Sequence, residues 1–347
     1  MQQRPAPPTV VDDLGNFRFG TFTTPFYTPD FQAAEVSDMH PFMGRPRPGG
    51  LGRWLRRMRL KEWQHIWMVS EEYCVSADIC LLGCVGAVWC QVIERDTGTC
   101  MSFARSVSFP RDIAFAESSV RGVTSWRDEG RYITFEYQPQ AGGLWSCTFN
   151  LPLDNGEKLK GQVSVYPEPE SLALVHPLHR NRAVYLHREA GNRAEGLITL
   201  GMRELRFEHD AQAGFEYVRS FPDAATRYTA LTASGVTGDG RRLGLSLSQG
   251  LYGAADCHVW LDGVLHALDA VEFTPPPHAG EVWHIASERC MLEFHPICTQ
   301  SQSLDHRLVK SKRVRHYGTL EGYLRFGGGL MQVTGPFGIC ETLNAAW

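Results

Sequence analysis

The segment from Glu216 to Tyr228 brings acidic, basic and phenolic side chains together within thirteen residues. If two or three of them point into a barrel, burial and pairing shift their pKa values and supply a general acid and base beside an apolar ligand. The alternative is a polar loop with ordinary ion pairs. We predict that the catalytic residues are Asp223, Tyr228, Glu216 and Arg227, with Tyr217 and Arg219 as ligand-binding residues.

A second group of candidates lies near the start of the apolar run that begins at Ile79. Lys61 and Trp63 could frame a ligand carboxylate, or they could simply pack, Lys61 by its aliphatic stem. Asp78 is either a turn or cap residue or an acid that points inward, and Tyr73 raises the same question. The predicted ligand-binding set therefore also contains Lys61, Trp63, Tyr73 and Asp78.

Several other chemistries lack their motifs in this sequence. There is no G-x-x-x-x-G-K-[ST] phosphate loop, no strand followed by G-x-G-x-x-G, and no G-x-S-x-G nucleophile elbow. The ten cysteines include no paired C-x2-C, and Pro177 disrupts regular geometry between His176 and His179, which fits a solvated loop. We predict neither a metal nor a cofactor.

Charge and hydropathy restrict the class of partner. A formal charge of −4 and a pI of about 6.4 argue against nucleic acid, because phosphate neutralisation requires an excess of Lys and Arg. No charged region followed by an apolar one marks a secretory signal at the N-terminus, and the longest apolar run is too short for a membrane helix. We expect a cytoplasmic protein with reduced thiols. The oligomeric state is left open.

The first part of the chain differs from the rest in composition and in hydrophobic periodicity. Residues 1–50 carry no sustained period, and their clustered phenylalanines predict an extended arm that is docked on a domain. Residues 45–61 contain seven basic residues and no acidic one, and Leu51, Trp54, Leu55 and Met58 have helical spacing. This basic segment could lie on an anionic membrane surface, or it could form a short helix that flanks a barrel with its arginines in water.

From Glu62 onward the pattern predicts short antiparallel strands. Residues 132–137 and 144–149 alternate faces around a Gly-rich turn, and residues 258–266 predict a hairpin at Asp262-Gly263. Strands every ten to fifteen residues without long helices favour meandering barrels or curled sheets over a parallel sheet. We expect an N-terminal arm over 1–58 and two all-β domains over 59–170 and 171–347, divided near the prolines at 167 and 169.

Several blocks in a fixed order resemble the DUF2804 family over most of the chain after about residue 45: Arg59-Leu-Lys-Glu-Trp63, Asp78 before the apolar run, Asp96-x-Gly98, residues 240–247, Val259 to His266, Val271-Glu-Phe273, Trp283, and Leu292 to Pro296. This resemblance implies a relationship to proteins built from two lipocalin-like barrels, such as carotenoid hydratase and tocopherol cyclase relatives. It supplies no catalytic residues.

Two functions follow as hypotheses. The first is a cofactor-independent enzyme that hydrates, cyclises or isomerises a hydrophobic small molecule in a barrel pocket by acid–base catalysis, a lyase or isomerase. The second is a non-catalytic protein that binds a lipid or another hydrophobic ligand. At least two coupled ionisable side chains in the lining favour the enzyme, and a uniformly apolar lining favours the carrier.

Overall fold

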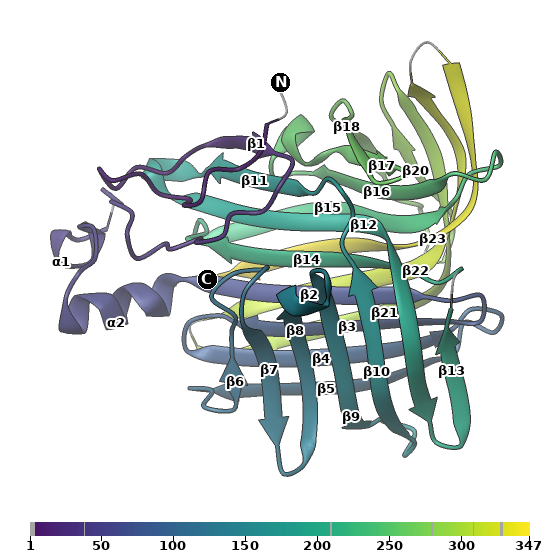
Figure 1. The fold of residues 1–347 in the computed structure, drawn as a ribbon, viewed down its shortest axis with the longest axis horizontal. Helices are drawn as coiled ribbons and strands as arrows, with labels where there is room; N and C mark the ends of the chain where they lie inside the picture. Colours follow the sequence, from purple (N-terminus) through teal and green to yellow (C-terminus); the bar gives the residue numbers. More distant parts are fainter. Residues whose placement is uncertain (1–3, 38, 209, 279, 308, 327–328) are drawn as a thin grey trace.

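Two curled antiparallel β-sheets make up most of the molecule, and the helices are few and short (Figure 1). The structure, a computed structural model, describes residues 4–347 apart from 38, 209, 279, 308 and 327–328. Each sheet curls into a half-barrel. The predicted all-β class, with two curled sheets in tandem, is confirmed.

The first sheet has fourteen strands and runs in the order β5-β4-β3-β2-β14-β12-β10-β9-β8-β7-β6, with β1, β11 and β13 attached beside that path. Its strands are β1 (Gly20–Phe22), β2 (Lys61–Val69), β3 (Tyr73–Leu81), β4 (Val85–Glu94), β5 (Cys100–Ser108), β6 (Ile113–Ala114), β7 (Val123–Asp128), β8 (Arg131–Gln138), β9 (Leu144–Pro152), β10 (Lys158–Tyr166), β11 (Leu172–Pro177), β12 (Ala183–Leu200), β13 (Arg203–Phe207) and β14 (Gln212–Ser220).

The second sheet has nine strands in the order β18-β17-β16-β15-β23-β22-β21-β20-β19. Its strands are β15 (Ala225–Val236), β16 (Arg242–Gln249), β17 (His258–Leu261), β18 (Val264–Ala267), β19 (Glu272–Thr274), β20 (Trp283–Ala286), β21 (Cys290–Asp305), β22 (Lys310–Phe326) and β23 (Gly329–Ala346). The chain changes sheet between Ser220 and Ala225, after the domain boundary expected near residue 170. That domain division stays a prediction.

The helices lie in the N-terminal part and in short connections: α1 (Pro41–Gly44), α2 (Gly50–Arg59), and the 3-10 turns η1 (Pro139–Ala141), η2 (His179–Asn181) and η3 (Gly253–Asp256). The spacing of Leu51, Trp54, Leu55 and Met58 predicted α2 correctly. Over the part of the chain that the structure describes, no helix is long and apolar enough to cross a bilayer.

Packed apolar side chains fill the concave side of each half-barrel. In the first, the largest of them include Trp126, Phe135 and Trp145, all almost fully buried, and in the second Leu245, Phe294 and Leu320 belong to a separate buried cluster. The sequence placed the ligand pocket inside a barrel. Apolar side chains occupy much of both interiors, because alternation along the strands sends one apolar row inward from each, and the barrel location of the pocket stays a prediction.

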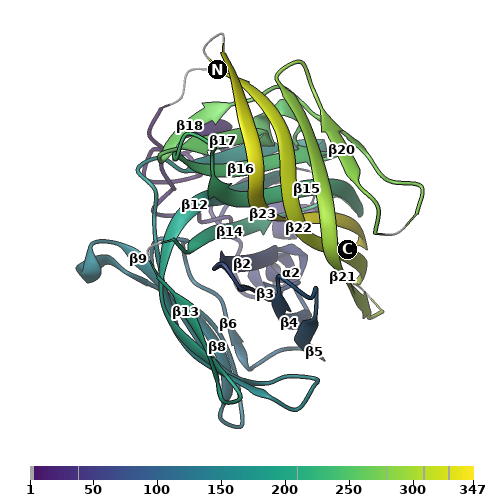
Figure 2. The same ribbon diagram turned by 90° about the vertical axis from the view of Figure 1, so that its right-hand side faces the viewer.

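The opposite faces of the two sheets meet each other. On β3, Val75, Ala77 and Ile79 belong to the core of the first half-barrel, so the alternate residues Ser76 and Asp78 point to the other side. β12 contacts β15 and β16, and β14 contacts β15. Figure 2 shows β15 to β23 stacked on the sheet that contains β2 and β14. This contact between the sheets, away from both barrel interiors, is where polar residues gather.

Candidate active-site cleft between the two sheets

A row of polar side chains crosses the first sheet on the face that meets the second sheet. Strand pairing places Arg188 on β12 opposite Glu216 on β14, Glu216 opposite His65 on β2, and His65 opposite Asp78 on β3. Residues that are directly opposite in a sheet point to the same face. The row is therefore a consequence of register, and a shift of one residue in any strand would break it.

The facing row on the second sheet supplies the countercharges. Arg315 on β22 donates from Nη1 and Nη2 to the two carboxylate oxygens of Asp78 at 2.6 and 2.9 Å, and Arg313 Nη1 donates to Asp78 Oδ1 at 3.1 Å. Asp78 is fully buried. Burial acts to raise its pKa, but the two guanidinium groups hold the pKa of Asp78 well below its usual range.

Glu341 on β23 joins this ion cluster to a phenol. Arg315 Nε donates to Glu341 Oε2 at 2.5 Å, and the Tyr228 hydroxyl donates to Glu341 Oε1 at 2.6 Å. Although burial acts to raise it, pairing with Arg315 and Arg313 lowers the pKa of Glu341 to about 2. Burial, with Glu341 and Glu216 nearby, raises the pKa of Tyr228 well above its ordinary value. At neutral pH the pair is a carboxylate that accepts from an intact phenol.

Glu216 forms the other charged wall. Trp63 Nε1 donates to Glu216 Oε1 at 2.7 Å, and Arg188 Nε donates to Glu216 Oε2 at 2.7 Å. Arg188 also donates from Nη1 to Asp256 Oδ1 at 2.9 Å and to Ser246 Oγ at 2.6 Å. Arg188 on β12 thus holds Glu216 from one side and reaches Asp256 and Ser246 of the second part of the chain, while the indole of Trp63 on β2 holds Glu216 from the other side.

His65 lies between these walls and is uncharged at neutral pH. Its Nε2 is 2.9 Å from Ser76 Oγ. Burial, assisted by the positive charge of Arg315, lowers the pKa of His65 to about 4. A neutral imidazole can accept a hydrogen bond at one ring nitrogen and donate one from the other without adding charge to the cluster.

Three adjoining hollows make up the cleft, and Tyr228 lines all of them. Their volumes are about 50, 130 and 30 Å³. The first two share Trp63 and Trp347, so these indoles separate them. Ligand pockets usually measure about 300–1,000 Å³, so a ligand of ordinary size requires an indole to move and join the hollows. The apolar part of the lining includes Trp63, Leu82, Trp89, Leu304, Leu343 and Trp347.

A larger depression of about 1030 Å³ lies elsewhere, at the open end of the second half-barrel. Its charged lining residues are Asp239, Arg241 and Asp262, all of them exposed, and Asp239 pairs with Arg241 at 2.8 Å. Solvated, mutually paired groups have little effect on a reacting molecule, whereas the cleft between the sheets holds buried charges in a low-dielectric setting. We therefore assign the functional site to the cleft. Among the residues that the structure describes, no three His, Cys, Asp or Glu side chains gather as a metal site requires.

The structure brings three of the predicted residues together in the lining of this cleft, Trp63, Glu216 and Tyr228, and a fourth, Asp78, lies behind the lining arginines. Two more, Asp223 and Arg227, line the hollow of about 130 Å³ beside Tyr228. Asp223 is partly exposed with Arg182 3.8 Å away, and Arg227 donates to Asn344 Oδ1 at 3.2 Å. These two lie at the rim, where solvent weakens their influence.

The other predicted residues point elsewhere. Tyr217 and Arg219 lie on the opposite face of β14, where both donate to Ala116 O at 3.0 Å and Arg219 pairs with Glu62 at 2.8 Å. Tyr73 packs against the core of the first half-barrel. Lys61 donates to Leu82 O at 3.0 Å, and its Nζ lies 5.9 Å from the ring centre of Trp347. Burial lowers the pKa of Lys61 to about 8. The assigned roles of these residues stay predictions.

Sequence reasoning missed the three arginines of the cluster, Arg188, Arg313 and Arg315, and the carboxylate of Glu341. The sequence does contain a pattern that indicates two of them. Arg313 and Arg315 are two positions apart, so on a strand their side chains point to the same face. Their partner Asp78 is 235 and 237 positions away. Only the pairing of the sheets reveals that contact.

Solved structures with a similar fold cover most of the chain. A candidate AttH from Nitrosomonas europaea has a TM-score of 0.53 at 12% identity over 82% of this chain and 92% of its own. CghA in complex with Sch210972 has a TM-score of 0.51 at 11% identity over 83% and 88%. Kievitone hydratase from Nectria haematococca is more distant, with a TM-score of 0.44 at 11% identity over 83% and 88%.

At such low identity, the first two likenesses concern the fold alone. Curated proteins give no match to this sequence. A family model described as "Domain of unknown function (DUF2804)" matches residues 9–347. The chain therefore belongs to the DUF2804 family, as the blocks in its sequence predicted.

Proposed function

We propose that the cleft binds a neutral, largely apolar small molecule and acts on it by proton transfer, as in hydration, cyclisation or isomerisation. The observation that carries this proposal is the buried Tyr228–Glu341 hydrogen bond beside a wall of indoles. An apolar lining with a few convergent polar groups is typical of sites for small molecules. Buried titratable groups with shifted pKa values are typical of catalytic sites.

Tyr228 is the group that would touch the reacting atom. Its proton is directed to Glu341, so a lone pair of the phenol oxygen is available on the hollow's side. A proton leaving the substrate passes to Tyr228 Oη while the phenol proton moves to Glu341, and the return step protonates the substrate. Arg315 and Arg313 keep Glu341 in place and ionised, so it can take the phenol proton only transiently and returns it to Tyr228 in the second step, while His65 lines the same hollow as a neutral imidazole.

The charge balance of the cleft sets the ligand class. Three guanidinium groups, those of Arg188, Arg313 and Arg315, face four carboxyl groups, those of Asp78, Glu216, Asp256 and Glu341. The cluster therefore has no excess of positive charge to receive an anion, and a ligand carboxylate would meet repulsion. This favours a neutral compound with one oxygen that can accept from or donate to Tyr228.

A carrier without catalysis is the second candidate. The apolar indole wall favours it, and so does the separation of the hollows, which would enclose a bound molecule. The fold likeness to CghA, a protein crystallised with the small molecule Sch210972, supports both candidates equally. The ionised lining is the feature that favours the enzyme, because a carrier requires a single polar anchor.

An experiment in isotopically labelled water distinguishes the enzyme from the carrier. Native mass spectrometry of freshly purified protein, followed by extraction, identifies the bound compound. That compound is then incubated with the protein in deuterium oxide or in water labelled with oxygen-18. The proposal predicts enzyme-dependent incorporation of label, because hydration, cyclisation and isomerisation all exchange protons or water with solvent. Recovery of the unlabelled compound after full binding would contradict catalysis and establish a carrier.

A contact between residues 45–61 and a membrane would bring the cleft to the phase in which apolar compounds concentrate. The expected cytoplasmic location stays a prediction.

A further inference from the structure

We propose that the end of the molecule formed by α1 and α2 docks on an anionic lipid bilayer. The docking face consists of three exposed apolar side chains, Phe42, Leu51 and Trp54, and five exposed arginines, Arg45, Arg47, Arg53, Arg57 and Arg59. This inference rests on these residues and not on the cleft, so it stands or falls independently of the catalytic proposal.

The first step of the argument is the orientation of α2, which is the reverse of a usual amphipathic helix. The residues of α2 that are buried against the body are Gly52 and Arg56. Arg56 donates to Phe31 O at 2.7 Å and to Ala34 O at 2.8 Å, and also to the carbonyls of Met43 and Arg45. Four backbone acceptors therefore fix the helix by its charged side chain.

The second step is the exposure that this orientation leaves. Leu51 is 60% exposed, Trp54 is 54% exposed and Phe42 is 44% exposed. An exposed Leu or Phe alone requires no explanation, but three on one projecting end, with an indole among them, mark an interaction surface. Leu55 and Met58 are half-buried, so the apolar stripe runs from the body outward to Leu51.

The third step is charge. Residues 41–61 contain seven basic and no acidic residues, although the whole chain carries −4. Arg56 and Lys61 are buried, so five arginines remain to contact solvent or a partner. Basic side chains around apolar ones match the interface of a bilayer with anionic headgroups, where indoles and aliphatic chains enter the acyl boundary.

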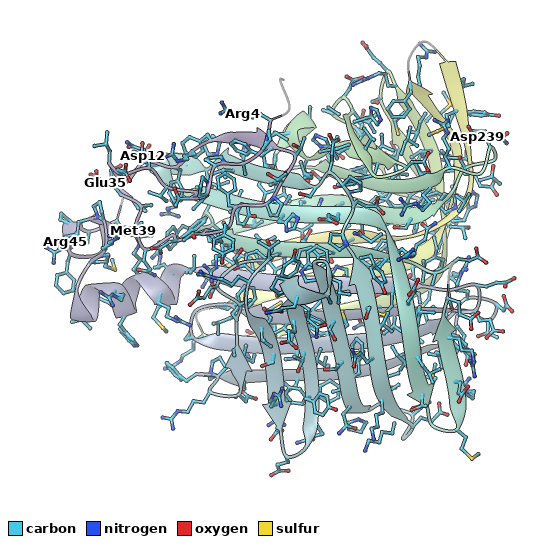
Figure 3. The ribbon with its side chains drawn as sticks, viewed as in Figure 1. Arg4, Asp12, Glu35, Met39, Arg45 and Asp239 are labelled. Carbon is cyan, nitrogen blue, oxygen red and sulfur yellow. The ribbon has the colours of Figure 1, made fainter. Side chains whose placement is uncertain are left out.

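The fourth step is shape. Figure 1 shows α1 and α2 at one end of the molecule, extending beyond the strands, and Figure 3 shows Arg45 at the same outer edge. A projecting end with an exposed indole can insert that indole into the surface of a bilayer. A nucleic acid would be expected to contact an arginine surface without an apolar centre. A bilayer accounts for both the exposed arginines and the exposed apolar side chains.

Vesicle sedimentation tests this proposal. The full-length protein is mixed with vesicles of phosphatidylcholine alone or of equal amounts of phosphatidylcholine and phosphatidylserine. We expect sedimentation with the mixed vesicles only, and release at high salt. Each basic residue near an anionic surface contributes about fivefold to binding, so Arg53→Gln with Arg57→Gln should reduce partitioning by about 25-fold. Trp54→Gln should reduce it by about tenfold at low salt, because the indole no longer enters the acyl boundary.

Matched variants on the second sheet provide the control. Leu330 is 65% exposed, and Leu330→Gln removes an apolar side chain of similar exposure far from α2 in the sequence. It should leave sedimentation unchanged. Three results would overturn the proposal: no sedimentation of the wild-type protein, equal loss in Trp54→Gln and Leu330→Gln, or a dimer that Trp54→Gln dissociates, which would show that a second copy covers this face.

Discussion

Tyr228 joins the three hollows, and its hydroxyl is directed to a carboxylate that two arginines hold in its ionised form. Its raised pKa means that the phenol remains protonated across the neutral range. Such a group is a poor free base but a good relay, because it can give its proton to Glu341 at the moment it receives another.

Replacing Tyr228 with phenylalanine removes this relay and little else. We expect Tyr228→Phe to reduce label exchange into the bound compound by about 10²-fold or more, with little change in the amount bound. Quantitative mass spectrometry of the extracted compound measures both. Tyr323→Phe, at a half-exposed position of β22, should leave both unchanged. A wild-type exchange rate in Tyr228→Phe would remove this residue from the mechanism.

Buried histidines make stability depend on pH in a defined window. Burial lowers the pKa of His65 and of His258 to about 4, and in the unfolded chain these groups titrate near 6.5. Between these values the unfolded chain binds protons that the folded chain does not, so the free energy of unfolding falls as pH falls through this window. The carboxyl groups of Asp78 and Glu341, whose pKa values are lowered, reduce stability only at more acidic pH.

Denaturant unfolding at pH 7.5 and pH 5 measures this effect. Each of the two histidines should lower the free energy of unfolding by about 2 kcal/mol over this interval. His65→Gln should remove its share of the difference, and His284→Gln, at an exposed site, should not. Equal pH dependence in His65→Gln and the wild type would show that His65 is protonated in the folded protein.

β22 carries the arginines that fasten the second sheet to the first. Asp78→Asn would leave Arg313 and Arg315 buried with one fewer countercharge, so we expect it to lower the free energy of unfolding by about 3–5 kcal/mol. The exposed pair Asp305–Lys310 joins β21 to the same strand at 3.2 Å, and Asp305→Asn should change stability by less than about 0.5 kcal/mol. Guanidinium unfolding measures both. An Asp78→Asn protein as stable as Asp305→Asn would mean that the ion cluster does not hold the sheets together.

The elements themselves were largely predictable from local sequence. The turn at Asp262-Gly263 has positive φ at both residues and joins β17 to β18, as its residue types indicate. α2 was predicted by spacing, but the side that it buries was not. Hydropathy places arginines in water, whereas Arg56 is buried because backbone carbonyls of the arm satisfy its guanidinium.

The whole molecule brings together residues that no local pattern connects. The two sheets and their antiparallel order follow from alternation and turns, but the side of each strand that forms a site depends on how the sheets stack. Glu216 and Tyr228 were predicted because they lie close together in the sequence. Their partners on β12, β22 and β23 come from other parts of the chain, up to 113 positions from Tyr228.

Binding of the neutral apolar dye Nile red, read by its fluorescence, tests where the molecule holds its ligand. Ser311 lines the cleft between the sheets, and Leu330 lines the depression at the end of the second half-barrel. Ser311→Trp should fill the cleft and weaken binding by at least tenfold, while Leu330→Trp and the exposed control Ser303→Trp should bind as the wild type does. If Leu330→Trp abolishes binding and Ser311→Trp does not, the ligand site lies in the half-barrel and not between the sheets.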